Sequence, residues 1–305
     1  MRNRSSLDAA AAENGESVGA AWARRKVGNL LRELREQAGV TQEDAAEFIE
    51  RHVTTLYKIE NGLPGVKLRP KGDIDGLVEL YGADEATHRR LTELLALTRL
   101  KGPFTRYRDV VSPEFDLYLG LEGSATELVS YEPDLVPGLL QTEAYASAIT
   151  SLPGGDGRSR PPTEVAKRVR LRRSRQSVLT RATDPLRLDV VLSETVLRRP
   201  VGGPQVLADQ LTHIVAMTEL PTVSVRVVRF AAGLHLGYTT GQFIVLRFPE
   251  DQPIAYCDGF LGDNYFNKPQ EVARYDEAFA DISKHALNAA DSREFIGQIT
   301  KETTT

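Results

Sequence analysis

The sequence has few of the features that mark secreted or membrane proteins. Cys257 is its one cysteine in 305 residues, so no disulfide can form within the chain, and we expect a small core thiol there. No segment approaches the ~18 consecutive apolar residues of a membrane span. Residues 1–20 are polar and small and lack the pattern of a signal peptide. These absences favour a cytoplasmic protein that does not contact a membrane.

An excess of positive charge is missing as well. Lys and Arg number 38 against 42 Asp and Glu, which gives a net charge of −4. Residues 21–100 hold 13 charges of each sign, which cancel. A binder of nucleic acid is commonly basic. Any such function must therefore depend on where the charges lie rather than on their number.

The residue types that catalysis and metal binding need are not clustered in the sequence. The segment with Asp258, Asp263 and Asn264 resembles a calcium loop only weakly, because it lacks the bidentate Glu at its end, and we interpret it as a polar turn. No glycine-rich phosphate loop occurs. The five histidines are scattered without metal-ligand spacing: His52, His88, His213, His235 and His285. We predict a protein that is not an enzyme and has no cofactor and no metal.

Length and composition predict two domains of an α+β protein. A chain of 305 residues with 41% hydrophobic residues is long enough for two cores. We expect a disordered tail over residues 1–20, a helical domain over 21–100, a boundary at Gly102-Pro103 and a second domain over 103–300.

Residues 21–100 have the periodicity of five helices around one core. Gly39 can adopt the left-handed conformation that ends the first helix. Thr41 is a good N-cap for a short second helix, with Asp44 in its first turn. The third helix is expected over Val53–Asn61, and the later two near 72–81 and 85–100. The domain is therefore predicted to be an all-α bundle.

The second half alternates helical and β-rich segments, which predicts an α+β domain with a small, mostly antiparallel sheet of three to five strands. The alternation of Val223, Val225 and Val227 with Ser224 and Arg226 is typical of a half-buried strand. The expected strands are Leu186–Leu192, Thr222–Phe230, Gly241–Phe248 and Ile254–Cys257. The expected helices lie near 113–122, 142–150, 163–180, 204–219 and 269–299.

The second and third predicted helices have the spacing of a helix-turn-helix, whose second helix enters the major groove of DNA. The runs Val40–Ile49 and Ile59–Gly62 make residues 21–100 resemble the lambda-repressor-like or Xre family. The resemblance implies that the outward face of the third helix reads base edges. The base-reading residues would be Val53, Thr54, Tyr57 and Lys58. A bundle without a DNA role is the alternative, but such a surface would be richer in Glu.

The same resemblance assigns other roles. Gln42, His52 and Asn61 would contact DNA phosphates, His52 also as N-cap of the third helix. Arg35 and Glu60 would form an ion pair that positions the third helix.

Two residues of the turn depart from the family. Glu50 stands where the family usually has Gly, and Arg51 where it usually has an apolar residue. Glu tolerates a positive φ poorly, and an acid facing DNA is unfavourable unless Arg51 offsets it. The departures leave open how this turn docks on DNA.

The second half resembles a large actinomycete set of two-domain regulators described as antitoxin-like. The matching runs include Tyr131–Thr142 and Leu197–Pro204. The resemblance implies a small protein partner bound by the C-terminal domain. Within the first run, Leu135, Val136, Leu139 and Leu140 form either core or a partner surface.

A basic run, 167–181, has seven positive charges and no acid. It is either a solvated helix face with Val165, Val169 and Leu179 turned inward, or a second contact with DNA phosphates or an acidic partner.

Together these features predict a sequence-specific transcriptional regulator. A homodimer would bind palindromic double-stranded DNA with its recognition helices ~34 Å apart, and the second domain would sense a small protein partner or a ligand. The alternative is an antitoxin-like interaction module that sequesters a small partner, with DNA binding that is only autoregulatory.

Overall fold

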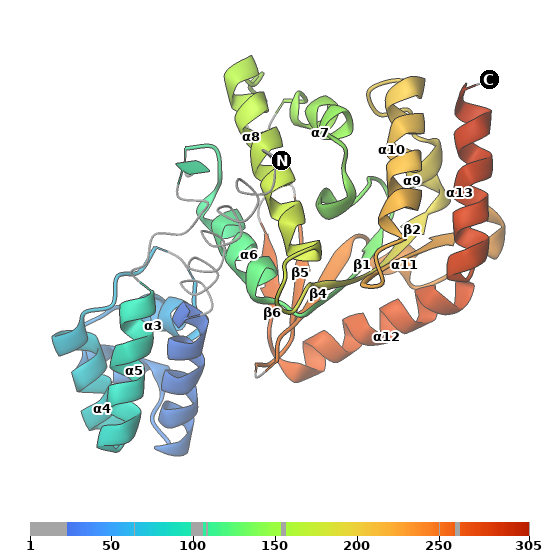
Figure 1. Cartoon of the computed structure of the whole chain (residues 1–305). Coiled ribbons are helices and arrows are strands. Elements are labelled where there is room, and N and C mark those ends of the chain that lie inside the picture. The colour runs from blue at the N-terminus through green and yellow to red at the C-terminus, as the bar shows by residue number, and fades with distance from the viewer. Residues whose placement is uncertain are drawn as a thin grey trace. The chain divides into compact units, whose positions relative to one another are not determined.

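The computed structural model describes residues 23–304 apart from 64, 99–105, 108, 154–156, 250 and 260–262. The chain divides into two compact units, Met1–Ser124 and Ala125–Thr305, which Figure 1 colours from blue to red along the chain. The first unit runs past Gly102-Pro103, because helix α6 (Pro113–Ser124) groups with it. The tail expected over residues 1–20 lies outside the described residues.

Among the described residues of 23–98, five helical segments form the expected bundle around one apolar core. Small and branched side chains such as Ala45, Leu56 and Leu91 are fully buried where the helices meet. The segments are a helix over residues 23–37, α2 (Gln42–Phe48), α3 (Val53–Glu60), a π-helical turn (Pro70–Ile74) that continues into α4 (Asp75–Tyr81), and α5 (Glu85–Leu97).

The ends of these helices follow the local sequence. Gly39 has φ 68° after the first helix, a conformation that costs glycine little. The Thr41 hydroxyl oxygen accepts a hydrogen bond from Asp44 N at 3.1 Å and donates to Asp44 Oδ2 at 2.7 Å. His52 caps α3, because its Nδ1 accepts from Thr54 N at 3.3 Å. The predicted caps at Thr41 and His52 are confirmed.

Six strands of the described part of the second unit form one mixed sheet with the order β3-β2-β1-β4-β5-β6. β1 pairs in parallel with β2, and β2 with β3. The pairings β1–β4, β4–β5 and β5–β6 are antiparallel. The strands are β1 (Glu127–Glu132), β2 (Arg187–Ser193), β3 (Val223–Val228), β4 (Phe243–Arg247), β5 (Ile254–Cys257) and β6 (Asn264–Phe266).

Helices cover both faces of this sheet (Figure 1). α12 packs on one face, where Val272, Ala278 and Ile282 contact Tyr131 and Phe243 in one buried cluster. The opposite face carries the side chains of the alternate strand positions and lies toward α7, α8 and α10. The helical segments are η3 (Gly138–Leu140), α7 (Glu143–Thr150), α8 (Pro162–Arg175), η4 (Gln176–Leu179), α9 (Glu194–Arg198), α10 (Pro204–Met217), η5 (Phe230–Ala232), α11 (Gly237–Thr240), α12 (Pro269–His285) and α13 (Ala289–Thr304).

The α+β class is confirmed, and the sheet is mostly antiparallel as predicted, with three antiparallel pairings and two parallel ones. Two details of the prediction are wrong. The described part of the sheet has six strands rather than three to five, since β1 and β6 were not predicted. The helix expected over 269–299 is two helices, because the Leu287 N–H donates to Val227 O of β3 at 2.9 Å instead of continuing the first of them.

Candidate nucleic-acid interface

The exposed side of α3 is the part of the first unit that has the predicted base-reading residues. Thr54, Tyr57 and Lys58 are exposed, Tyr57 to 52%. Leu56, Ile59 and Glu60 form the opposite, buried side. Val53 is only partly exposed and packs against the bundle core. Three of the four predicted readers therefore share one accessible surface, and the fourth lies at its edge.

An ion pair fixes the C-terminal end of α3 to the first helix. Arg35 Nε donates to Glu60 Oε1 at 2.7 Å, and Arg35 Nη2 donates to Glu60 Oε2 at 3.1 Å. Glu60 is completely buried, and its hydrogen bonds raise the pKa of Arg35 above its ordinary value. Arg35 Nη1 also donates to Val40 O at 3.1 Å. The pair therefore ties α3 to the first helix and to the loop before α2.

The three predicted phosphate contacts make hydrogen bonds inside the unit. Gln42 Nε2 donates to Glu60 Oε2 at 2.7 Å, so it belongs to the same buried cluster. His52 Nδ1 lies 2.8 Å from Thr54 Oγ1. Asn61 Nδ2 donates to Tyr57 O at 2.8 Å and closes the end of α3. These side chains hold the helix ends. To contact a DNA phosphate, each of them would have to bind it alongside its present hydrogen bond within the unit or give that hydrogen bond up.

The turn before α3 holds the two residues that depart from the family. Glu50 has φ 54°, the left-handed conformation that a Gly would adopt there without strain. Arg51 does not face Glu50. It donates to Asp73 from Nε at 3.0 Å and from Nη2 at 2.9 Å. Arg51 is therefore engaged within the bundle, and how the turn docks on DNA stays open.

Asp73 is the centre of a network that the sequence did not reveal. Its carboxylate is fully buried and also accepts from Arg69 Nη2 at 2.8 Å and Arg69 N at 2.7 Å. Burial would raise the pKa of Asp73, but the hydrogen bonds from Arg51 and Arg69 outweigh it and lower that pKa. Arg69 Nη2 further donates to Ile49 O at 3.2 Å. The network thus joins the end of α2, the turn and the π-helical segment.

Two glycines let the first helix approach α3 closely. A Cβ on Gly28 would overlap Ile59 O and lie 2.8 Å from Glu60 O. Gly62 has φ 64°, and a Cβ there would lie 2.8 Å from Arg25 Cα. Only glycine fits where these backbones meet. A lone Gly inside a helical pattern was the signal in the sequence for such an approach.

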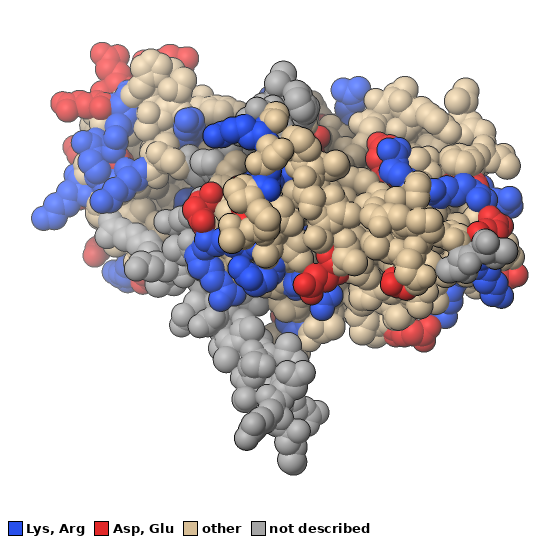
Figure 2. All heavy atoms as spheres, turned by 90° about the horizontal axis from the view of Figure 1, so that it is seen from above, with Lys and Arg blue, Asp and Glu red and all other residues tan. Residues whose placement is uncertain are grey.

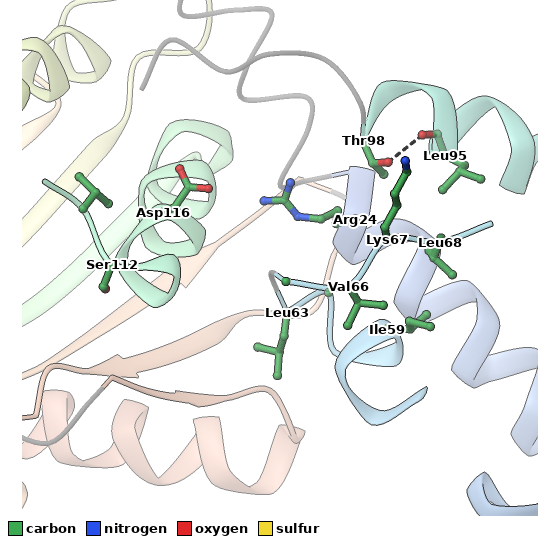
Figure 3. A pocket seen from close by; sticks show the side chains of 13 residues that line it. Arg24, Ile59, Leu63, Val66, Lys67, Leu68, Leu95, Thr98, Ser112 and Asp116 are labelled. Atoms are coloured by element: carbon green, nitrogen blue, oxygen red, sulfur yellow. Dashed lines mark hydrogen bonds between the residues drawn. The ribbon is translucent and has the colours of Figure 1, made fainter. Parts of the chain in front are cut away.

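A pocket of about 730 Å³ in the first unit is lined from α3 by Ile59, a buried residue of that helix (Figure 3). Ile59, Val66, Leu68 and Leu95 give it an apolar wall. None of the predicted DNA contacts lines it. It is therefore separate from the candidate interface.

Charges on the face drawn in Figure 2 form separate groups, with Lys and Arg in several places and Asp and Glu between them. This mixture of charges agrees with the sequence, in which 38 Lys and Arg stand against 42 Asp and Glu.

The predicted partner surface in the second unit is wrong for three of its four residues. Val136, Leu139 and Leu140 are at most 3% exposed, so the alternative in which they form core holds. Leu135 is partly exposed. Apolar side chains gather at the surface elsewhere, in the segment from η5 to α11: Phe230, Leu234, Leu236 and Tyr238.

The basic run is not a simple solvated face. Val169 and Leu179 are buried as expected, but so is Arg175, which is 6% exposed. Arg172 Nη1 donates to Gln141 Oε1 at 2.7 Å. Burial, and then the charge of Arg175, lower the pKa of Arg172 to about 10. Part of the run therefore holds α8 onto the preceding loop.

The other sequence candidates have ordinary surroundings. Cys257 is half-buried, its Sγ donates to the Tyr275 hydroxyl at 3.3 Å, and burial raises the pKa of the thiol. Among the described residues, no three His, Cys, Asp or Glu side chains lie together as metal ligands would. No helix in the described part of the chain is long and apolar enough to span a membrane.

Comparisons with known proteins agree with the geometry of the first unit. Residues 26–91 match the model of a helix-turn-helix domain, so the chain carries the DNA-binding domain found in transcriptional regulators. Residues 115–298 match the family described as domain of unknown function (DUF5753). Because this match spans more than half of the chain, the protein belongs to the DUF5753 family. No curated protein and no solved structure matches it.

Proposed function

We propose that the protein is a sequence-specific DNA-binding regulator of transcription of the Xre type, whose second unit senses a small protein partner or a ligand. The observation that carries the proposal is the exposed polar side of α3, with Thr54, Tyr57 and Lys58. Its buried side is held by Glu60 and the core. A helix held in this way can present side chains to base edges without losing its position.

The proposal includes a homodimer without catalytic activity. A single short recognition helix reads few base pairs, and two copies on a palindrome double the contacts. A regulator of transcription acts where the chromosome is, so the proposal keeps the cytoplasmic localisation and double-stranded DNA as partner.

The test is the effect of Lys58→Ala on sequence preference. DNA sequences selected by the full chain from a random pool define the operator, and binding is then measured on the operator and on single-base variants. We expect Lys58→Ala to lose discrimination at one position per half-site, by about tenfold or more. Lys284→Ala, an exposed substitution in α12, should change nothing.

Gln42→Ala distinguishes positioning from reading. It should weaken binding to all sequences alike, because Gln42 contacts Glu60 and lies beside the DNA backbone in the proposed complex. If purified protein ignores duplex DNA at low salt, or if Lys58→Ala and Gln42→Ala lose specificity equally, the assignment of roles fails.

The antitoxin-like alternative is favoured by one observation, the exposed apolar segment of the second unit. Leu234 is 85% and Tyr238 63% exposed, more than isolated surface positions need. If a small protein encoded beside the gene binds there, co-expression should yield a stable complex that Leu234→Asp abolishes. Operator binding confined to the protein's own promoter would then favour this alternative over a general regulator.

A further inference from the structure

A buried acid with an unpartnered oxygen lies at the carboxyl end of β1. Glu132 is the last residue of that strand and is 2% exposed. Its Oε1 accepts no hydrogen bond, and Ser130 Oγ, also fully buried, makes none. Leaving such atoms without partners is unfavourable. Two of them, two residues apart, indicate a site that something else completes.

The sheet register places both groups on the face opposite α12. Ser130 pairs with Ile244, which pairs with Tyr256, so these three side chains share a face. Glu132, two residues beyond Ser130, shares it too, whereas Tyr131 and Phe243 belong to the cluster with α12. Glu132 and Ser130 therefore face the side of α7 and α8.

The strand order makes this edge a natural binding place. From β1 the chain adds β2 and β3 on one side and then crosses to β4 on the other. Ligands of open sheets bind outside the carboxyl ends of the strands where the order reverses in this way. β5 runs in the same direction as β1, because both are antiparallel to β4. Asp258, which follows β5, therefore lies at the same edge as Glu132.

No ion pair among the described residues includes Glu132, and Arg199, whose charge acts on neighbouring Tyr145, is already paired with Asp134 at 2.8 Å. Burial raises the pKa of Glu132 to about 8; the nearby Ser130 hydroxyl, which does not meet hydrogen-bond geometry with the carboxyl, lowers that pKa, and Asp258 raises it further. From α7, Tyr145 faces Glu132, with its hydroxyl accepting from Val136 N at 3.2 Å. Asp258 raises the pKa of Arg172 in α8, so the two charges interact, but the Arg172 guanidinium already donates a hydrogen bond to Gln141. The missing partner is therefore positively charged and rich in donors.

We propose that this edge of the sheet binds a small organic molecule through a primary ammonium group, which donates hydrogen bonds to Glu132 Oε1 and Ser130 Oγ. Asp258 adds negative potential at this edge of the sheet. A ligand with a carboxylate or phosphate would place its acceptor oxygens against the acceptor oxygen of Glu132 and would be repelled by the charge of Asp258. On binding, the Glu132 carboxyl loses its proton to solvent and pairs with the ammonium. The inference rests on the proposed function only in naming what the second unit would sense, since binding itself needs no DNA.

Three molecules of matched shape test the charge requirement on the full chain: n-butylamine, 1-butanol and butyrate. At pH 7 we expect n-butylamine to raise the temperature of unfolding at a concentration where the other two have no effect. Titration calorimetry in phosphate and in HEPES should show release of up to one proton per bound amine, because the buffers differ in their heat of ionisation. Equal effects of amine and alcohol would overturn the proposal.

Glu132→Gln keeps the shape of the side chain and removes its charge. We expect it to lower the affinity for n-butylamine at least about tenfold and to abolish proton release. The control is Glu127→Gln at the other end of β1, where the partly exposed carboxylate is bound to Arg247 at 3.1 Å; this variant should bind n-butylamine as the wild type does. Binding by Glu132→Gln at the wild-type affinity would overturn the proposal.

Ser130→Ala gives a second variant that does not touch the acid. It should lower the affinity for n-butylamine several-fold while proton release on binding persists. An unchanged affinity would show that Ser130 does not contact the ammonium group. If the full chain binds n-butylamine as expected but no operator DNA, the proposed regulator function is wrong and the ammonium site stands. If it binds operator DNA but not n-butylamine, the ammonium site is wrong and the regulator function stands.

Discussion

Glu50 holds the turn before the recognition helix in a conformation that glutamate does not favour. With φ 54°, its Cβ is crowded by the neighbouring carbonyl, at a cost of about 1–2 kcal/mol relative to glycine. The hydrogen bond from Arg51 N to Ala46 O at 2.9 Å keeps the turn closed. Strain at a tight turn beside a binding surface is thus stored in one residue.

Glu50→Gly should therefore stabilise the first unit. The relief of backbone strain outweighs the extra conformational entropy that glycine loses on folding. We therefore expect the free energy of unfolding to rise by about 0.5 kcal/mol. Removing the acid should also tighten operator binding. Glu47→Gly in α2 is the control, because the same substitution inside a helix should cost about 1 kcal/mol. Thermal unfolding of both variants checks this, and losses of equal size would contradict it.

Glu132 makes stability depend on pH. Burial raises its pKa from the ordinary 4.5 to about 8. Between these values the folded chain keeps the proton and the unfolded chain has lost it, so each rise in pH favours unfolding. The stabilising contribution of the protonated group is complete below about pH 4.5 and disappears as the pH rises to about 8. Denaturant unfolding of the wild type relative to Glu132→Gln should reveal this slope, and a constant difference across the window would refute it.

At the scale of elements, the crossing of the first helix over α3 depends on Gly28. A methyl group there would overlap the Ile59 carbonyl, so Gly28→Ala should push α3 outward and destabilise the unit by about 1–3 kcal/mol. Gly297→Ala in α13 is the matched control, because nothing lies within 4 Å of its Cβ position. That variant should gain about 0.5–1 kcal/mol from helix propensity. Unfolding midpoints of the two variants should thus move in opposite directions, and a neutral Gly28→Ala would show that the crossing adjusts.

Elements with local signals could be predicted from the sequence. Thr41 and His52 cap helices through atoms two or three residues away, so the pattern of residues alone locates them. Glu50 was singled out only by the family resemblance, since it stands where the family usually has Gly, and its φ of 54° became known from the structure. β1 was missed because Leu128–Tyr131 is buried on both faces and shows no alternation.

Contacts between distant residues could not be predicted. Asp73 binds Arg51 across 22 positions, and charged residues give no periodic signal for burial. Glu132, which directly precedes Pro133, was not singled out from the sequence, yet it is buried at the end of a strand of the sheet. At the candidate interface, Thr54 and Lys58 were identifiable from helical spacing, whereas the engagement of Gln42 by Glu60 required the fold.

At the scale of the whole molecule, the two units differ in what each can do. The first unit carries the helix-turn-helix domain, with the short helix α3 as the proposed DNA-reading element. The second unit has a sheet of its own and the exposed apolar segment with Leu234 and Tyr238. A surface of that kind is typical of association. Assembly into a dimer is therefore expected to depend on the second unit.

A fragment that ends at Ser124 tests this division of labour. It should fold, because its bundle has its own core, but bind each half-site independently. The full chain should bind two half-sites about 10 base pairs apart cooperatively, about 10²-fold more tightly than the fragment, because the second contact becomes intramolecular. Moving the half-sites by about half a helical turn should weaken the full chain and leave the fragment unchanged. Gel shifts on both DNA probes give the comparison, and equal affinities of fragment and full chain on both probes would show that the second unit does not assemble the regulator.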